Sequence, residues 1–250
     1  MGTLNIDMIM SIPRAIELVV YLTCAIIIYR KRDYYLNKVY AFSLIGWSLY
    51  VICDILIFPI GHFEPYIIMA SGEPGITYPL IANILRDFQV LGGLLTAFGY
   101  IYASIVIRYG VLKAKEKKTM GILIIAAVIF SLIGMLNDGI IRNVNETPQV
   151  VQTDYKPLGI AIFFVEITLF FIAVYEHIRA YREIDISKPE KRRIMYFIFG
   201  SVLIAAGVIY FIIIGQVVPG RDYQIITGPI GHAIWILSPL CILYGFRKAN

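Results

Sequence analysis

The chain has 250 residues, of which 59% are hydrophobic and 16% are charged, and its mean hydropathy is +0.75. A soluble domain is about 45–50% apolar and about 25% charged, so this composition excludes an ordinary soluble protein and indicates a surface that faces lipid. The formal net charge of +5 fits the basic cytoplasmic loops of a membrane protein, and we expect no nucleic-acid partner.

Seven mostly apolar stretches are long enough to cross a bilayer, which takes roughly 17–25 residues. They cover residues 13–29, 37–60, 79–108, 119–140, 157–180, 193–216 and 225–246. Pro13, Pro79 and Pro157 lie at three expected starts, where proline costs no internal hydrogen bond. Gly110 marks a turn. A basic cluster rather than a cleavage site follows the first stretch, so we expect it to be retained. The sequence therefore predicts an all-α integral membrane bundle of seven transmembrane helices, forming a single domain over residues 1–250.

The distribution of Lys and Arg predicts the orientation of this bundle. Most of the 22 basic residues fall in the connections after the first, third and fifth stretches and in the C-terminal tail. Cytoplasmic loops carry such an excess, so we expect a multi-pass protein of the cell membrane with its N-terminus outside and its C-terminus in the cytoplasm. The glycosylation sequon Asn145-Glu146-Thr147 falls on the outer side. Tyrosines are expected to anchor the chain at the membrane interface, among them Tyr29, Tyr34, Tyr35, Tyr40, Tyr175, Tyr181, Tyr196 and Tyr244.

Ionisable and amide side chains gather near the outer ends of the predicted helices. The candidate ligand-binding residues are Asp54, Asn83, Arg86, Asp87, Glu166 and His232. Charged groups in a bilayer usually pair or line a cavity, and Arg86 is expected to pair with Asp54 or Glu166. The set forms either a polar pocket in the outer leaflet or an ion-pair network that only fixes helix packing. Glu17 and Asp138 lie close enough to the outer surface to extend their carboxylates into water.

Small residues in the third stretch predict its place in the bundle. Gly92 and Thr96, like Gly93 and Ala97, are four residues apart, a spacing at which membrane helices pack closely. We therefore expect this helix to lie at the centre of the bundle.

Other residue patterns argue against a cofactor, a metal or a catalytic site. The last stretch contains no lysine, which excludes a retinal Schiff base there. The 3 histidines and 3 cysteines lack the spacing of haem or zinc ligands. His177, near the basic rim, is expected to be solvated. We expect no cofactor, no metal ligands and no catalytic residues, and we favour a protein that is not an enzyme.

A basic first loop at residues 30–38 leads into a helix with Trp47, Tyr50 and Asp54. The next predicted helix contains residues 86–93 and ends at an aromatic-glycine turn, Arg108-Tyr109-Gly110. This order resembles the seven-helix membrane sensory modules at the N-terminus of some prokaryotic histidine kinases, over residues 36–110. The resemblance implies a sensory role. The chain departs from the pattern because no kinase follows the last helix, so a signal would pass to a separate protein.

These observations favour a sensor- or receptor-like module that binds a small ligand, a lipid or a partner in the outer polar pocket. Its partners would be the lipid bilayer and a protein at the cytoplasmic loops or within a membrane complex. A structural or accessory subunit of a larger complex is the alternative. A proton- or cation-coupled transporter is a third possibility, although no inverted repeat is evident.

Overall fold

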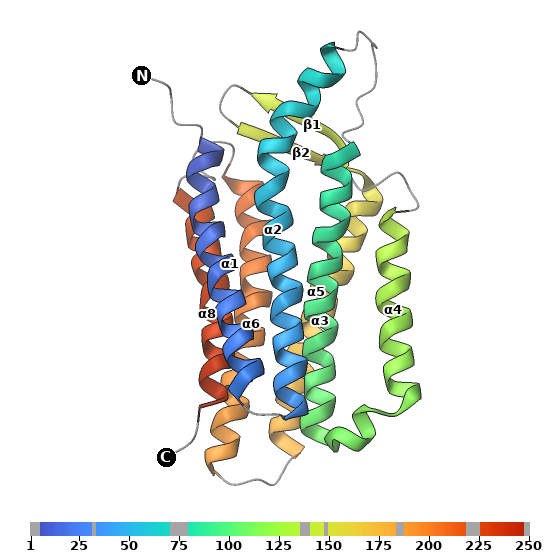
Figure 1. The fold of residues 1–250 in the computed structure, drawn as a ribbon, viewed down its shortest axis with the longest axis vertical. Coiled ribbons are helices and arrows are strands. Elements are labelled where there is room, and N and C mark those ends of the chain that lie inside the picture. The colour runs from blue at the N-terminus through green and yellow to red at the C-terminus, as the bar shows by residue number, and fades with distance from the viewer. Residues whose placement is uncertain are drawn as a thin grey trace.

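The computed structural model describes residues 6–31, 34–70, 80–135, 141–147, 150–183, 188–218 and 226–247. The helices in this part of the chain are α1 (Ile6–Lys31), α2 (Tyr35–Ala70), α3 (Leu80–Ala114), α4 (Lys117–Met135), α5 (Pro157–Glu183), α6 (Lys188–Val217) and α8 (Gly228–Gly245). Strands β1 (Ile141–Thr147) and β2 (Val150–Tyr155) lie between α4 and α5. Figure 1 shows long helices standing side by side, with the strands at one end.

Six of these helices are long and apolar enough to cross a membrane. The spans are Ser11–Lys31, Tyr35–Ile57, Asn83–Ala114, Pro157–Glu183, Lys191–Ile214 and Gly228–Gly245. They support the prediction of a multi-pass helical membrane protein, and each overlaps one of the predicted apolar stretches. Helix α4 overlaps the remaining one, up to Met135.

Some predicted helix boundaries are wrong. Helix α1 begins at Ile6, so Pro13 lies inside it rather than at its start. Proline is tolerated inside membrane helices because neighbouring groups can satisfy the carbonyl that it frees. Helix α2 continues beyond its predicted end to Ala70. Pro157 does begin α5, as predicted.

The antiparallel hairpin of β1 and β2 was not predicted. Val144 pairs with Thr153, and Thr147 pairs with Val150. These β-branched residues favour strands, but the segment lacks the alternation of apolar and polar residues that signals one. The hairpin contacts α1, α2, α3 and α5. Asn145 of the sequon lies in β1, and Asp138 lies outside the described residues.

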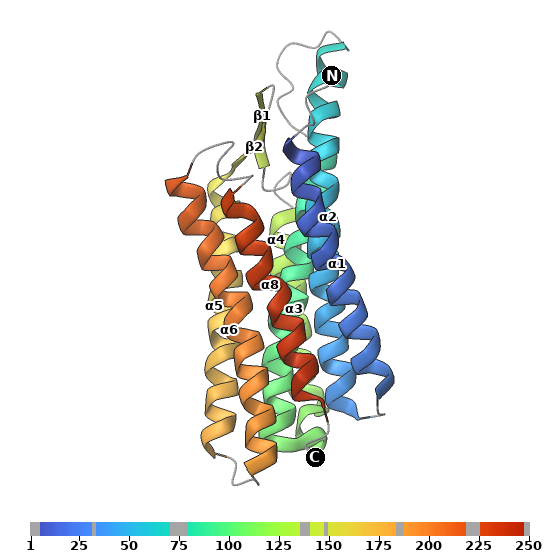
Figure 2. The ribbon, with the colours of Figure 1, turned by 90° about the vertical axis from the view of Figure 1, so that its left-hand side faces the viewer.

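Helix contacts form a closed ring. They run from α1 to α2, α3, α5, α6 and α8, and from α8 back to α1. The ring contains the same six helices that are long and apolar enough to cross a membrane. Helix α4 stands outside it and packs mainly on α3 (Figures 1 and 2).

Helices α2 and α3 pack closely at two glycines, Gly46 and Gly92. A Cβ atom on Gly92 would lie 2.6 Å from the carbonyl oxygen of Gly46 and 2.6 Å from the backbone nitrogen of Tyr50. Thr96 donates a hydrogen bond to the carbonyl oxygen of Ser43 at 3.0 Å. Helix α3 also has the largest buried share of the six spans. It lies in the ring between α2 and α5, and it also contacts α4.

Aromatic side chains fill the ring. The largest fully buried ones are Trp47, Tyr21, Tyr40, Tyr100 and Phe170. The predicted interfacial position is wrong for Tyr40, because its hydroxyl lies 2.7 Å from Nε2 of His177 inside the bundle. Buried tyrosine hydroxyls usually have a hydrogen-bond partner, and the histidine provides one for Tyr40. Tyr29, Tyr175 and Tyr244 are exposed at the bundle surface.

The two ends of the bundle differ in charge. We call the end that carries β1 and β2 the hairpin end, and the opposite end, which carries the C-terminus, the basic end (Figure 1). Basic residues with described side chains at the basic end are Arg30, Lys31, Lys38, Arg108, Lys113, Lys115, Lys117, Lys118, Arg179, Arg182, Lys191, Arg192, Arg193 and Arg247. Gly110 breaks α3 there, with a φ of +81° that glycine adopts readily.

Candidate functional site

A group of charged and amide side chains connects three helices near the hairpin end. Nε of Arg14 on α1 donates to Oδ2 of Asp54 on α2 at 2.5 Å. Nη1 of Arg86 on α3 lies 3.6 Å from Oδ1 of the same carboxylate. Gln89 donates to this oxygen at 3.2 Å and accepts a hydrogen bond from Arg86. We call Arg14, Asp54, Arg86 and Gln89 the charged network.

A second group surrounds Glu17 on α1. Nε1 of Trp47 on α2 donates to Oε1 of Glu17 at 2.6 Å. Nδ1 of His232 on α8 lies 2.6 Å from Oε2. The expectation that Glu17 reaches into water is wrong, because its side chain is 0% exposed. Two partners on neighbouring helices satisfy both carboxylate oxygens inside the ring, and burial is therefore tolerated. We call Glu17, Trp47 and His232 the Glu17 cluster.

The charged network and the Glu17 cluster share two helix faces. Arg14 and Glu17 are three residues apart on α1, and Trp47 and Asp54 are seven apart on α2. Both spacings bring side chains to the same side of a helix. The two groups together connect α1, α2, α3 and α8, which are all members of the ring.

The structure brings Asp54 and Arg86 together, as predicted, and places the other candidates around them. Asn83 is buried one turn before Arg86 on α3. Glu166 on α5 is 4% exposed and faces Gly93, about two turns along α3 from Arg86. Asp87 is half-buried, and its Oδ1 has no hydrogen-bond partner in the described part of the chain.

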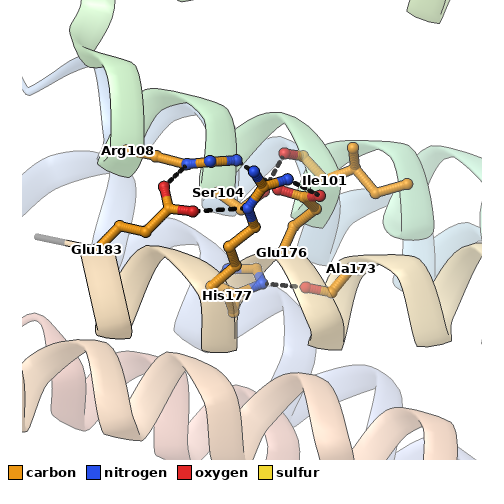
Figure 3. Close-up of polar contacts among 8 residues, drawn as sticks. Ile101, Ser104, Arg108, Ala173, Glu176, His177 and Glu183 are labelled. Atoms are coloured by element: carbon orange, nitrogen blue, oxygen red, sulfur yellow. Dashed lines mark hydrogen bonds and ion pairs between the residues drawn. The ribbon is translucent and has the colours of Figure 1, made fainter.

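At the basic end, ion pairs connect α3 to α5 (Figure 3). Arg108 contacts Glu183 and lies 3.3 Å from Glu176, while Arg179 donates to Glu183 at 2.7 Å. Both arginines converge on the same two carboxylates. These ion pairs hold α3 and α5 together at the basic end.

The prediction that His177 is solvated is wrong. Its side chain is 0% exposed and points into the ring, where Nε2 meets the hydroxyl of Tyr40. Nδ1 lies 2.7 Å from the carbonyl oxygen of Ala173, one turn earlier on α5 (Figure 3). The neighbouring Glu176 faces Arg108 instead, because adjacent residues on a helix point in different directions.

Sequence reasoning missed several members of the site. It left Arg14, Trp47 and Gln89 out of the candidate pocket. The three-residue spacing of Arg14 and Glu17 was a usable signal, because it puts opposite charges on one helix face. The pairing of Glu17 with His232 joins residues 215 positions apart and leaves no local signal.

The charged network and the Glu17 cluster can keep charged side chains inside an apolar bundle. A polar ligand that bound to them could change how the helices pack. No set of three His, Cys, Asp or Glu side chains among the described residues could hold a metal ion. No protein-family model matches the chain, and no curated protein sequence matches it.

Proposed function

We propose that the chain is a sensor- or receptor-like membrane protein with a single domain of seven transmembrane helices. These are the six helices of the ring together with α4. Its N-terminus lies outside the cell and its C-terminus in the cytoplasm. The charged network and the Glu17 cluster, together with Asn83, Asp87 and Glu166, form its ligand-binding region. The observation that carries the proposal is the convergence of Arg14 and Arg86, from two helices, on the single carboxylate of Asp54.

Buried charges make this region suited to a response. Removing water from an ion pair costs several kcal/mol per ion, and good geometry must compensate for that cost. A polar ligand that contacts Asp54 or either arginine changes this balance. Arg14, Asp54 and Arg86 belong to three different helices. A change in their ion pairing therefore favours a different arrangement of these helices.

Aromatic contacts extend from this region toward the basic end. The rings of Trp47 and Trp235 are 5.1 Å apart, and Tyr40 lies two turns along α2 from Trp47. Tyr40 contacts His177 on α5, the helix that carries the ion pairs with Arg108. A shift of α1 or α2 at the hairpin end can therefore act on packed side chains at the basic end, where a partner protein would bind.

The orientation can be tested by labelling single cysteines in intact cells with a reagent that does not cross membranes. Cysteine at position 145, in the hairpin, is expected to react from outside, because the positive-inside rule places the basic end in the cytoplasm. Cysteine at positions 115 and 192 should react only after the cells are opened. The chain without a new cysteine is the control for Cys24, Cys53 and Cys241. Reaction of position 115 from outside would place the candidate site on the cytoplasmic side.

Ligand binding can be tested by measuring the melting temperature of the purified protein with a panel of small carboxylates, amines and phosphates. At least one compound is expected to raise the melting temperature of the natural protein, because binding stabilises the folded state. The Asp54→Asn variant should lose this response, whereas Glu116→Gln, an exposed control, should keep it.

Other outcomes would favour other functions. Proton uptake by vesicles that contain the protein alone would indicate a transporter. Copurification with a stoichiometric partner that is unaffected by Asp54→Asn, without any ligand response, would indicate an accessory subunit. Turnover of a substrate by the protein alone would indicate an enzyme.

A further inference from the structure

A pocket of about 320 Å³ opens on the outside of the helix ring, and residues of α2, α3 and α4 line it. Its lining is almost entirely apolar and includes Phe42, Phe98, Leu123, Ile124 and Ala127. Phe42 and Ile124 are each 57% exposed, so the pocket is open to the surroundings of the helices. Those surroundings are the bilayer for helices that cross a membrane.

The packing of the helices explains why this pocket exists. Gly99 lines the pocket, and its α-carbon lies so close to Ser43 that a Cβ atom would collide with that side chain. Helices α2 and α3 are therefore joined tightly, while α4 packs mainly on α3. Small side chains on α4, such as Ala127, leave the remaining space open.

The mouth of the pocket is polar and basic. Lys38 lines it at the basic end. The hydroxyls of Tyr35 and Tyr102 lie 2.9 Å apart, and the latter donates to the carbonyl oxygen of Ala114. Nζ of Lys115 lies 4.5 Å from the centre of the Tyr35 ring.

The α3–α4 turn adds further charge beside this mouth. Besides Lys115, this turn carries Lys113, which pairs with Glu116 at 2.8 Å. Lys117 and Lys118 follow at the start of α4. With four lysines and one glutamate, residues 113–118 are positively charged next to an apolar pocket.

We propose that this pocket holds one acyl chain of an anionic phospholipid, with the lipid phosphate bound between Lys38 and Lys115. From Met120 to Ala127 the lining of α4 extends about 10 Å along the helix, enough for a large part of one chain. Basic residues near a membrane surface attract anionic headgroups, and a pocket of this volume suits a small apolar ligand. The site lies at the opposite end from the charged network and does not depend on the function proposed for that network.

The selectivity of the site can be tested with vesicles of phosphatidylglycerol and phosphatidylcholine in equal amounts. Protein reconstituted there is extracted in mild detergent, and its bound lipids are counted by native mass spectrometry. We expect phosphatidylglycerol to be retained about fivefold over phosphatidylcholine for each lysine at the phosphate. The Lys38→Gln/Lys115→Gln variant should lose this preference, and Lys191→Gln, elsewhere at the basic end, should keep it. Equal retention of the two lipids by the natural protein would overturn the proposal.

The pocket itself is tested by filling it. Ala127→Phe places a ring in the apolar space and should remove the retained lipid. Ile125→Phe is the matched control, because Ile125 is on the same helix, is 60% exposed and does not line the pocket. Full lipid retention by a folded Ala127→Phe protein would overturn the proposal.

Two further results identify the occupant. Displacement of the lipid by inorganic phosphate would show that the headgroup alone binds, and would contradict the acyl-chain site. Because Lys38 and Lys115 are at the surface, their substitution leaves the proposal testable if Ala127→Phe does not fold.

Discussion

Replacement of Asp54 by alanine is expected to destabilise the bundle by about 3–5 kcal/mol. The substitution removes the carboxylate that lies 2.5 Å from Arg14 and 3.6 Å from Arg86, and it leaves two cations close together in a mostly buried place. The loss can be measured as the free energy of unfolding in mixed micelles titrated with sodium dodecyl sulfate.

A double-mutant cycle separates the ion pair from the rest of this effect. The Arg14→Ala/Asp54→Ala protein should be more stable than the sum of the two single losses predicts, by about 0.5–3 kcal/mol. The matched control is Lys113 with Glu116, an ion pair 2.8 Å long whose side chains are 57% and 48% exposed. Its coupling should lie near 0–1 kcal/mol. A coupling for Arg14 and Asp54 as small as that of the control would show that the charged network does not hold the helices together.

Gly92→Ala is expected to cost about 1–3 kcal/mol, the usual penalty for overfilling a well-packed interior. The new methyl group would lie 2.6 Å from backbone atoms of both Gly46 and Tyr50, and α2 would have to move away from α3. Backbone atoms cannot rotate aside as side chains do, so the whole contact must loosen. The melting temperature and the unfolding free energy in detergent both report this loss.

Gly121→Ala provides the control for the same chemical change. Apart from the neighbouring residues and backbone of α4 itself, no described atom lies within 4 Å of the place that a Cβ on Gly121 would occupy. Alanine is the better helix former, so this variant should be as stable as the natural protein or more stable by about 0.4–1 kcal/mol. Equal stability of the two variants would mean that α2 and α3 do not pack closely at Gly92.

Apolar length was enough to predict the six described helices that could cross a membrane, and small-residue spacing predicted the close packing of α3. These signals are local, because a bilayer requires each helix to satisfy its own backbone and to cover it with apolar side chains. The pairing of Asp54 with Arg86 could also be predicted, since a charge at such a depth needs a partner. The structure agrees with the sequence on both points.

Side-chain partners from distant helices could not be predicted in the same way. The burial of Tyr40 and His177 depends on which faces of α2 and α5 turn into the ring, and the apolar pattern does not distinguish these faces. The exposed isoleucines on these helices face outward, where lipid favours the same residue types as a protein interior. The hairpin was missed because its strands are largely polar.

The contact between Glu17 and His232 has a consequence for how the protein is made. Trp47 is synthesised 30 residues after Glu17, but His232 follows only after 215. At about 5–20 residues per second, the interval before His232 is synthesised is roughly 10–40 s. During this time the nascent chain holds a carboxylate with only one of its two permanent partners. Insertion of α8 completes both the ring and the partners of Glu17, so a chain truncated before α8 would keep an incompletely paired acidic group that membrane quality control could recognise.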